Sequence, residues 1–317
     1  MKNSFLQYLV TPAPLAQLPA DWHGEIFRRD APLGIEIGFG NGEYLVRWHH
    51  ARPDWNLVGI ELSMESCERL MKRLVAGDIS PVRVIHDNAR FVLRECFGDN
   101  SVSRVVMNCP DPWPKDKHKE RRLIDAQFAE TLSAVLTMGG QYELVTDQPW
   151  YAEDAHAIFS ADPRFALAPL EKGLQRSETT RYERKWLEMN REMTRLVATK
   201  IAATPIERKC KDNRMPHAFI DREIRDEFVK PLCGLEHREG EDLFIVKSAL
   251  RDMEEDRYIL KVVAADQGYR QSFLVQIKPH ETGRWLVKLD PSVQPYRTPA
   301  VKMAIRQIAA ALVEPAG

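Results

Sequence analysis

The sequence predicts an α/β domain built on a mostly parallel sheet, followed by a smaller α+β domain with an antiparallel sheet. Through the first two thirds of the chain, short apolar runs alternate with helix-compatible stretches. This alternation implies parallel strands covered by helices on both faces. The runs are continuous in Val, Ile and Leu, as strands buried on both faces require. Beyond about residue 200 the alternation stops, and strand-like runs follow one another.

Five apolar runs are the expected strands of the first domain, and each is followed by a polar loop. They cover residues 33–37, 56–62, 82–85, 103–108 and 141–147, while residues 165–170 and 184–190 can supply two closing strands. Helices are expected at residues 43–50, 63–75, 90–97 and 149–159, and also after residue 122, where apolar residues recur at helical spacing. Ser63 is the expected N-cap of the second helix.

The domain boundaries follow from these patterns. We expect a flexible or surface-packed leader over residues 1–30, the first domain over 31–199, a linker over 200–216, and an accessory domain over 217–317. In the accessory domain we expect a helix at 217–229, strands at 242–248, 257–263, 271–277 and 284–290, and a final helix that starts at Thr298 and Pro299.

The composition excludes several classes of protein. With 44% hydrophobic and 29% charged residues the chain resembles an ordinary globular protein. Its net charge of −1 means that any nucleic-acid surface must be a local patch. Five dispersed cysteines without a CxxC pair indicate reduced thiols and a cytoplasmic location, and they predict no metal site. No apolar run approaches the roughly 20 residues of a membrane span, so we expect no membrane association.

A glycine loop follows the first expected strand. Its glycines are Gly38, Gly40 and Gly42, so the spacing is GxGxG rather than the GxGxxG of pyrophosphate-binding dehydrogenases. Glu36 lies inside the strand, where a carboxylate suits a ligand with an ammonium group. Glu61, at the end of the second strand, can accept both hydroxyls of a ribose. Asn88 would lie at the edge of an adenine. Partners for an ammonium group, a ribose and an adenine fit S-adenosylmethionine better than a nicotinamide cofactor.

The stretch from Asn108 to Arg122 reads NCPDPWPKDKHKERR. Three prolines in five residues exclude a helix or a central strand, so this is a stiff loop that presents Asp111 and Trp113. The charged block that follows can hold the phosphates of a nucleic acid, or it can be an ordinary solvated surface. Trp113 can stack on a base or pack beneath the loop.

At this point the chain resembles a known family. Residues 33 to about 190 look like the bacterial tRNA (guanine-N-7)-methyltransferases, which modify a guanine in the tRNA variable loop. The matching motifs are LGIEIGFGNGEYL, VGIEL, DNAR, PDPWPKDKHKERRL, VTDQPWYA and TTRYERKW. The resemblance implies a Rossmann-like class I methyltransferase fold with a seven-stranded sheet. It also implies S-adenosylmethionine as the methyl donor, S-adenosylhomocysteine as the product and tRNA as the partner.

The resemblance also implies roles for individual residues. The cofactor contacts would be Glu36, Gly38, Gly40, Gly42, Glu61, Asn88 and Asp111, with Asp111 also the catalytic residue. The substrate contacts would be Lys115, Asp147, Thr180, Arg181, Tyr182 and Glu183. The RNA-contacting strip would be Lys117, His118, Lys119, Arg121 and Arg122. Asp116 and Glu120 make this strip less basic than is usual for the family.

Guanine N-7 has a free lone pair, so its methylation needs no general base. We therefore expect Asp111 to position the base and to stabilise the positive charge that develops on it. The alternatives are another nucleic-acid-directed class I methyltransferase, a nicotinamide-dependent oxidoreductase, or a non-catalytic RNA-binding protein. The resemblance says nothing about residues beyond about 200, which form either an RNA-docking module or an assembly module. The protein is expected to be a monomer or a homodimer.

Overall fold

The chain forms two compact units in a computed structural model that describes residues 5–174, 192–212, 214 and 216–313, apart from the side chains of Asp116 and Lys119. The first unit comprises residues 1–12 and 19–207, and the second comprises residues 13–18 and 208–317. Residues 180–183 and the expected closing strand at 184–190 lie outside the described residues.

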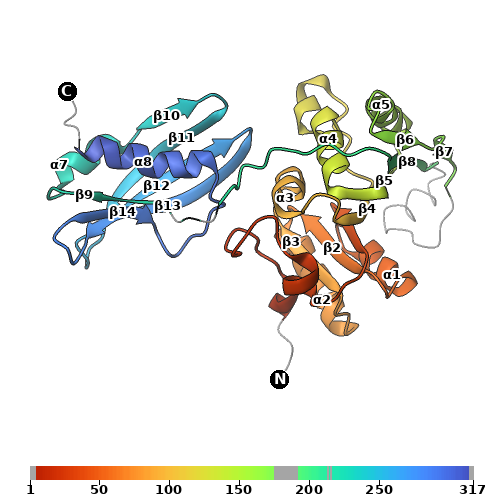
Figure 1. Ribbon diagram of the computed structural model, residues 1–317, viewed down its shortest axis with the longest axis horizontal. Helices are drawn as coiled ribbons and strands as arrows, with labels where there is room; N and C mark the ends of the chain where they lie inside the picture. Colours follow the sequence, from red (N-terminus) through yellow and green to blue (C-terminus); the bar gives the residue numbers. More distant parts are fainter. Residues whose placement is uncertain (1–4, 175–191, 213, 215, 314–317) are drawn as a thin grey trace. The chain divides into compact units, whose positions relative to one another are not determined.

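The first unit contains an eight-stranded sheet (Figure 1). Its strands are β1 (Leu33–Ile37), β2 (Asn56–Glu61), β3 (Val82–His86), β4 (Val102–Asn108), β5 (Leu136–Thr146), β6 (Phe165–Leu167), β7 (Glu171–Lys172) and β8 (Thr194–Lys200). Seven strands follow the order β3-β2-β1-β4-β5-β8-β6, and the short β7 pairs with β8. The β1 to β5 pairs are parallel, while β8 is antiparallel to β5. This is the predicted Rossmann-like methyltransferase sheet, but it has eight strands where seven were expected, because the two-residue strand β7 also pairs with β8.

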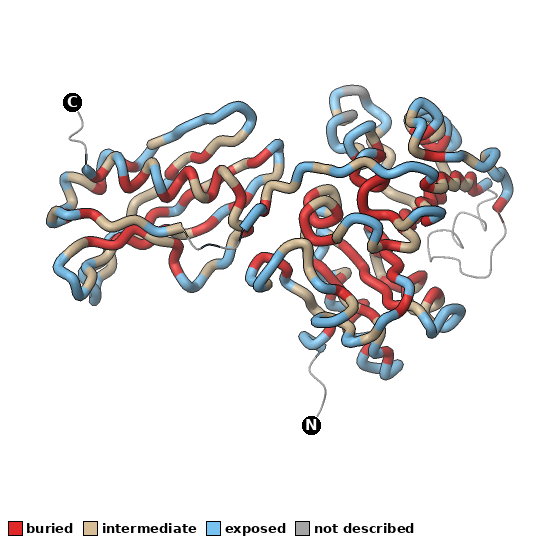
Figure 2. Tube along the Cα trace, viewed as in Figure 1, coloured by how far each residue is buried: buried red, intermediate tan, exposed pale blue. Residues whose placement is uncertain are grey.

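Helices cover both faces of this sheet. They are α1 (Glu43–Ala51), α2 (Met64–Ala76), α3 (Ala89–Cys96), α4 (Ala126–Val135) and α5 (Pro149–Ser160), with short turns η1 (Phe5–Tyr8), η2 (Trp22–Phe27) and η3 (Asp116–Arg121). The pairs α1–α2 and α2–η1 pack together, as do α3–α4 and α4–α5. Ser63 caps α2 as predicted, because its side chain accepts a hydrogen bond from the Ser66 N–H. The inner strands are buried along most of their length (Figure 2).

Two parts of the first unit differ from the prediction. The strand β8 was not expected, because its alternating burial lacks the continuous apolar run that marks the other inner strands. The expected leader contributes to the core at two places. Tyr8 is buried, and the Trp22 ring stacks on Phe97 with centroids 4.6 Å apart while its Nε1 donates to the Cys96 carbonyl at 2.8 Å.

The second unit contains an antiparallel sheet of order β10-β11-β12-β13-β14-β9. Its elements are β9 (His217–Ile220), α7 (Asp226–Val229), η4 (Lys230–Leu232), β10 (Glu236–Glu239), β11 (Asp242–Arg251), β12 (Tyr258–Asp266), β13 (Tyr269–Pro279), β14 (Trp285–Leu289) and α8 (Pro299–Val313). The helix α8 lies across one face of this sheet (Figure 1). Its predicted apolar stripe is confirmed, since Val301, Ile305, Ile308 and Leu312 are all buried.

The helix expected at residues 217–229 was wrong. Residues 217–220 form the edge strand β9, which pairs with β14, and only Asp226–Val229 is helical. This pairing with β14 decides the local conformation, and the helical preference of the local sequence does not outweigh it. β10 was also not expected, because all four of its residues are exposed and polar.

All five cysteines are free thiols, and Cys67, Cys96 and Cys210 are buried. Among the described residues, no three His, Cys, Asp or Glu side chains converge as metal ligands would. In the same part of the chain, every helix is too short or too polar to cross a bilayer.

Candidate active site

The glycine loop bends through backbone conformations that favour glycine. Gly38, Gly40 and Gly42 have φ angles of +67°, +55° and +74°. A Cβ on Gly42 would lie 2.5 Å from Leu70 of α2, so this position excludes a side chain on steric grounds as well. At Gly38 and Gly40 a Cβ would meet nothing within 4 Å. These two residues therefore leave open space beside the backbone, where a ligand can approach it.

Glu61 ties the end of β2 to this loop. Its Oε2 accepts a hydrogen bond from the Gly40 N–H at 3.0 Å. Its Oε1 accepts from the N–H groups of Leu62 at 2.8 Å and Ser63 at 3.0 Å. The carboxylate is only half-buried and lines the cavity described below. Burial, with the nearby charge of Glu61 as a smaller cause, raises the pKa of the Cys67 thiol to about 12, which keeps that thiol protonated.

Glu36 is held at the neighbouring strand end. Its side chain is 1% exposed, and its Oε1 accepts a hydrogen bond from Nδ2 of Asn108, the last residue of β4, at 2.9 Å. Because β1 and β4 are adjacent parallel strands, this bond joins their carboxyl ends. A carboxylate buried at this place is suited to a cationic group of a ligand. The sequence alone did not indicate the role of Asn108.

A cavity of about 300 Å³ opens at the carboxyl ends of β1, β2 and β3. The segments that line it are residues 37–38, 60–62, 87–90 and 120–123. It therefore brings together Gly38, Glu61 and Asn88, three of the predicted cofactor residues. Asn88 is also the N-cap of α3, since its Oδ1 accepts from the N–H groups of Arg90 at 3.0 Å and Phe91 at 3.3 Å.

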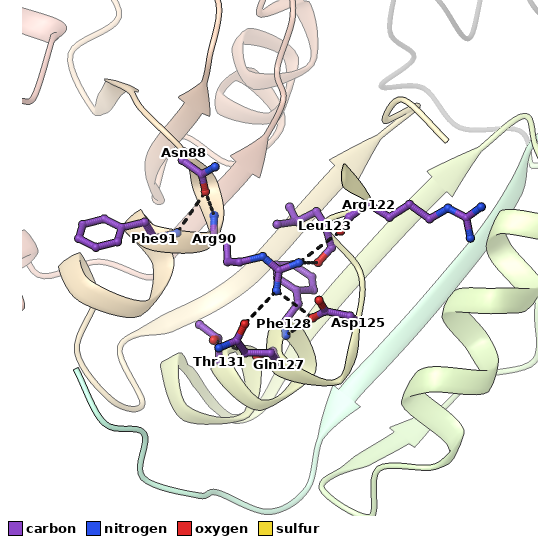
Figure 3. Close-up of polar contacts among 9 residues, drawn as sticks. All are labelled: Asn88, Arg90, Phe91, Arg122, Leu123, Asp125, Gln127, Phe128 and Thr131. Carbon is purple, nitrogen blue, oxygen red and sulfur yellow. Dashed lines mark hydrogen bonds and ion pairs between the residues drawn. The ribbon is translucent and has the colours of Figure 1, made fainter. Parts of the chain in front are cut away.

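Arg90 closes one side of this cavity, and the sequence did not single it out. Its guanidinium donates to the Leu123 carbonyl at 2.8 Å, to the Arg122 carbonyl at 3.3 Å and to Oδ1 of Asp125 at 2.9 Å (Figure 3). Asp125 in turn caps α4 by accepting from the Phe128 N–H at 2.8 Å. Arg90 thus fixes the end of the charged segment to the start of α3. Its place in the DNAR motif was the signal that could have identified it.

The proline-rich loop leaves β4 in a strained conformation. Cys109 and Trp113 both have positive φ angles, +47° and +44°, which are uncommon for residues with side chains. The Cys109 N–H donates to the Val145 carbonyl of β5 at 2.7 Å. The loop is held at its other end by Arg122, whose Nε and Nη2 donate to the Trp113 carbonyl at 3.2 Å and 3.0 Å. Asp111 lies between these two anchors and is exposed.

The charged strip separates into two groups. Lys115, Lys117 and Arg121 are exposed, and the Arg121 guanidinium lies over the Trp113 ring at 4.8 Å. Arg122 has a side chain that is only 10% exposed, and it forms an ion pair of 3.3 Å with Asp154.

The two aromatic residues of the stretch lie together. His118 is half-buried and meets the edge of the Trp113 ring, with centroids 5.6 Å apart. Trp113 is itself half-buried. Both of the roles expected for its ring, stacking and packing, are compatible with that position. Of the predicted RNA-contacting residues, only Lys119 has a side chain outside the described structure.

The remaining predicted substrate residues are placed only in part. Asp147 follows β5, is half-buried, and its Oδ2 accepts from Nε2 of Gln148 at 2.9 Å. The four residues from Thr180 to Glu183 lie outside the described residues. Asp111, Lys115 and Asp147 do not line the 300 Å³ cavity. They follow β4 and β5, the next two strands of the parallel sheet after β1, so they share its carboxyl edge with the glycine loop.

Comparison with known proteins identifies the family. Residues 30–196 match the model of the methyltransferase family Methyltransf_4. A Thermotoga maritima protein named tRNA (guanine-N(7)-)-methyltransferase is 37% identical over 304 residues, which cover 95% of this chain and 96% of that protein. A protein of the same name from Thermus thermophilus is 30% identical over 311 residues, covering 95% and 94%. Another from Pseudomonas fluorescens is 35% identical over 152 residues, covering 48% of this chain and 63% of that protein.

These matches favour a methyltransferase over the oxidoreductase alternative. They also extend the sequence-based resemblance, which ended near residue 190, because the first two relatives match across both units. The chain is a methyltransferase and belongs to the tRNA (guanine-N(7)-)-methyltransferase family.

Proposed function

We propose that the protein transfers a methyl group from S-adenosylmethionine to N-7 of a guanine in the tRNA variable loop. The observation that carries this proposal is the convergence of Gly38, Glu61 and Asn88 on one cavity at the carboxyl edge of the sheet. Ligands of open α/β sheets bind at this edge. The family membership supplies the reaction class, and the names of the relatives supply the substrate.

The residues present fit the proposed cofactor. Gly38 and Gly40 leave space beside the backbone, and the carboxylates of Glu36 and Glu61 are acceptors for an ammonium group and for ribose hydroxyls. Asn88 borders the same cavity, where its amide can meet an adenine edge. When bound, S-adenosylmethionine supplies an electrophilic methyl group. The protein itself holds both reactants in line, and this positioning accounts for a large part of the rate enhancement.

Asp111 acts on the guanine rather than as a base. The N-7 lone pair is free at neutral pH, so no proton has to leave before it reacts. The ring becomes cationic as the new bond forms, and a carboxylate beside it stabilises that charge. The anchoring of the loop by Arg122 supports this role, because a fixed carboxylate does not have to reorganise during the reaction.

Recognition of the RNA is divided between phosphates and base. The exposed cations Lys115, Lys117 and Arg121 are suited to the backbone. His118, Lys119 and Arg122 complete the strip, the last mainly by holding the loop. The carboxylates of Asp147 and Glu183 are the acceptors for guanine N-1 and its amino group, and Thr180, Arg181 and Tyr182 belong to the same substrate segment. Adenine lacks that donor pair, and such a contact discriminates by about 1–3 kcal/mol.

A methyl-transfer assay tests the proposal directly. The purified protein is incubated with S-adenosylmethionine labelled in the methyl group and with tRNA transcribed without modifications. The tRNA is then digested and its nucleosides are separated. We expect the label in 7-methylguanosine. Label in a different nucleoside would mean another nucleic-acid-directed methyltransferase, and no label, under conditions where the Thermotoga maritima relative is active, would reject the proposal.

A further inference from the structure

The sheet of the second unit has two faces of different character. One face packs against α8 and contributes to an apolar core that includes Phe244, Val262, Phe273 and Val287. Side chains alternate between the faces of a strand, so the residues between these positions point to the opposite side. We call this second side the open face because Lys261, Arg270 and Ser272 on it are exposed, although Gln276 and Leu286 on the same side are buried. The open face is defined by the alternate residues of β9 to β14, those that do not belong to this core.

The open face carries a set of cations. Lys261 lies beside Leu274, Arg270 beside Ala265, and Lys288 between Gln276 and His217. Lys278 lies beside Leu286 on the next strand, and Leu286 in turn lies beside Phe219 of β9. Lys261 and Arg270 are exposed, while Lys278 and Lys288 are half-buried. None of these four cations forms an ion pair with a described residue, so their charges are available to a ligand.

Few carboxylates offset this charge. Glu236 of the edge strand β10 lies beside Ile245, and Arg238 on the same strand lies beside Leu243. Asp290 follows β14, is 7% exposed and accepts a hydrogen bond from the Ser292 N–H at 2.9 Å. The face is therefore locally basic in a chain whose net charge is −1. A local excess of cations is the electrostatic pattern expected for a polyanion-binding surface.

An aromatic cluster lies at one side of the open face. The Phe219 ring meets the ring of His217 at 5.7 Å and that of His280 at 5.1 Å. The Arg284 guanidinium lies over the Phe219 ring at 4.2 Å, and it is 3.9 Å from Asp221. Phe219 is half-buried, so part of the ring surface remains accessible. Aromatic and guanidinium planes on a sheet are surfaces on which unstacked RNA bases pack.

We propose that the open face binds RNA, with Lys261, Arg270, Lys278 and Lys288 on phosphates and the Phe219 cluster on an unstacked base. This proposal rests on the proposed function in one respect, namely that the RNA is a tRNA. The charge of the face favours RNA over an apolar partner. An apolar partner would leave the four cations without counter-charges, whereas the phosphates of an RNA backbone supply negative charges at regular intervals. The second unit is thereby an RNA-docking module.

The test neutralises the four cations together in the full-length protein, as Lys261→Gln, Arg270→Gln, Lys278→Gln and Lys288→Gln. Binding of unmodified tRNA is measured by fluorescence anisotropy over a series of salt concentrations. Each phosphate contact contributes about 0.7–0.9 to the slope of log K against log salt. We therefore expect the magnitude of that slope to fall by about 3. At low salt we expect the Kd for tRNA to rise by about tenfold or more.

A matched control removes charge from the other side of the sheet. Arg306 of α8 and Lys230 of η4 are both exposed, and the double variant Arg306→Gln, Lys230→Gln should bind tRNA as the unmodified protein does. Phe219→Leu keeps an apolar side chain of similar size but removes the ring, and it should weaken binding by about five- to a hundredfold. If the quadruple variant fails to fold, as judged by its circular dichroism, the pair Lys261→Gln and Lys288→Gln replaces it.

Three outcomes would overturn the proposal. The quadruple variant could bind tRNA with the original slope, or the control variant could lose as much affinity as the quadruple variant. Alternatively, the quadruple variant could change only the oligomeric state, which would make the open face a contact between copies of the chain. Because binding is measured without methyl transfer, these outcomes are distinct from a failure of the proposed function, which the nucleoside assay detects.

Discussion

Arg90, in the first turn of α3, forms an ion pair of 2.9 Å with Asp125, the N-cap residue of α4. The same guanidinium donates to the carbonyls of Arg122, the last residue of the charged strip, and of Leu123, which follows it. One side chain therefore joins the proposed cofactor cavity to the segment that anchors the loop of Asp111 and Lys115, because Arg122 in that segment bonds to the Trp113 carbonyl. This contact is the structural link between the two halves of the proposed site.

Replacing Arg90 by methionine should loosen this link. The change removes the charged hydrogen bonds but keeps an apolar stem, so we expect a loss of about 1–3 kcal/mol in the free energy of unfolding. We also expect a rise in KM for both S-adenosylmethionine and tRNA, because the cavity and the loop share this support. Urea denaturation and steady-state kinetics measure the two effects. Arg69→Met, which breaks an exposed ion pair with Glu65 on α2, is the control and should change neither KM. An unchanged KM for tRNA in Arg90→Met would contradict the positioning role.

Replacing Asp111 by asparagine should slow methyl transfer without affecting the fold. The side chain is exposed, so the thermal denaturation curve should not move. Loss of the carboxylate removes stabilisation of the developing charge, and we expect kcat to fall by about 10²–10³. Single-turnover kinetics with saturating tRNA measure this rate. Asp30→Asn, at another exposed carboxylate, should retain the original rate. A full rate in Asp111→Asn would assign the electrostatic role to another residue.

Replacing Glu61 by glutamine should weaken cofactor binding. The carboxylate accepts from three N–H groups, and an amide, with only one acceptor oxygen, cannot serve them all. The glycine loop should lose its support, and the Kd for S-adenosylhomocysteine should rise by about ten- to a hundredfold. Calorimetric titration measures this constant. Glu65→Gln, four residues along on the exposed face of α2, provides the control, and equal affinities for the two variants would argue against a cofactor role for Glu61.

The pH dependence of stability should contain a contribution from His49. Burial, with the neighbouring charges of His50 and Arg29, lowers the pKa of His49 below its usual 6.5. Between the lowered pKa and 6.5 the unfolded chain binds more protons than the folded chain, so stability rises with pH over that window. Urea denaturation at several pH values from 5 to 7 (about the range in which histidine titrates) measures the slope. His49→Gln should flatten it. An identical slope in His49→Gln would assign the effect to other groups.

Much of the first unit could be predicted because its strands are buried on both faces. Such strands appear in the sequence as continuous apolar runs, and β1 to β4 were located to within a residue or two. Glu36 and Glu61 lie at or near the ends of two of these runs and the glycine loop follows the first, so their place at one edge of the sheet followed from chain order. The edge strands were harder. β9 and β10 have too few buried residues for a pattern, and pairing with a neighbour decides their conformation.

The sequence by itself determined the family, the parallel sheet and the edge at which we propose that the chemistry takes place, because motifs and buried strands are local signals. Tertiary structure decided how that edge is assembled. The Asn108–Glu36 bond spans 72 positions, and Arg90 reaches residues 32 to 35 positions away. Only folding brings such partners together. Folding also assembles the open face of the second unit from separate parts of the chain. Its four cations, Lys261, Arg270, Lys278 and Lys288, lie on three strands, and sheet pairing places them on one surface.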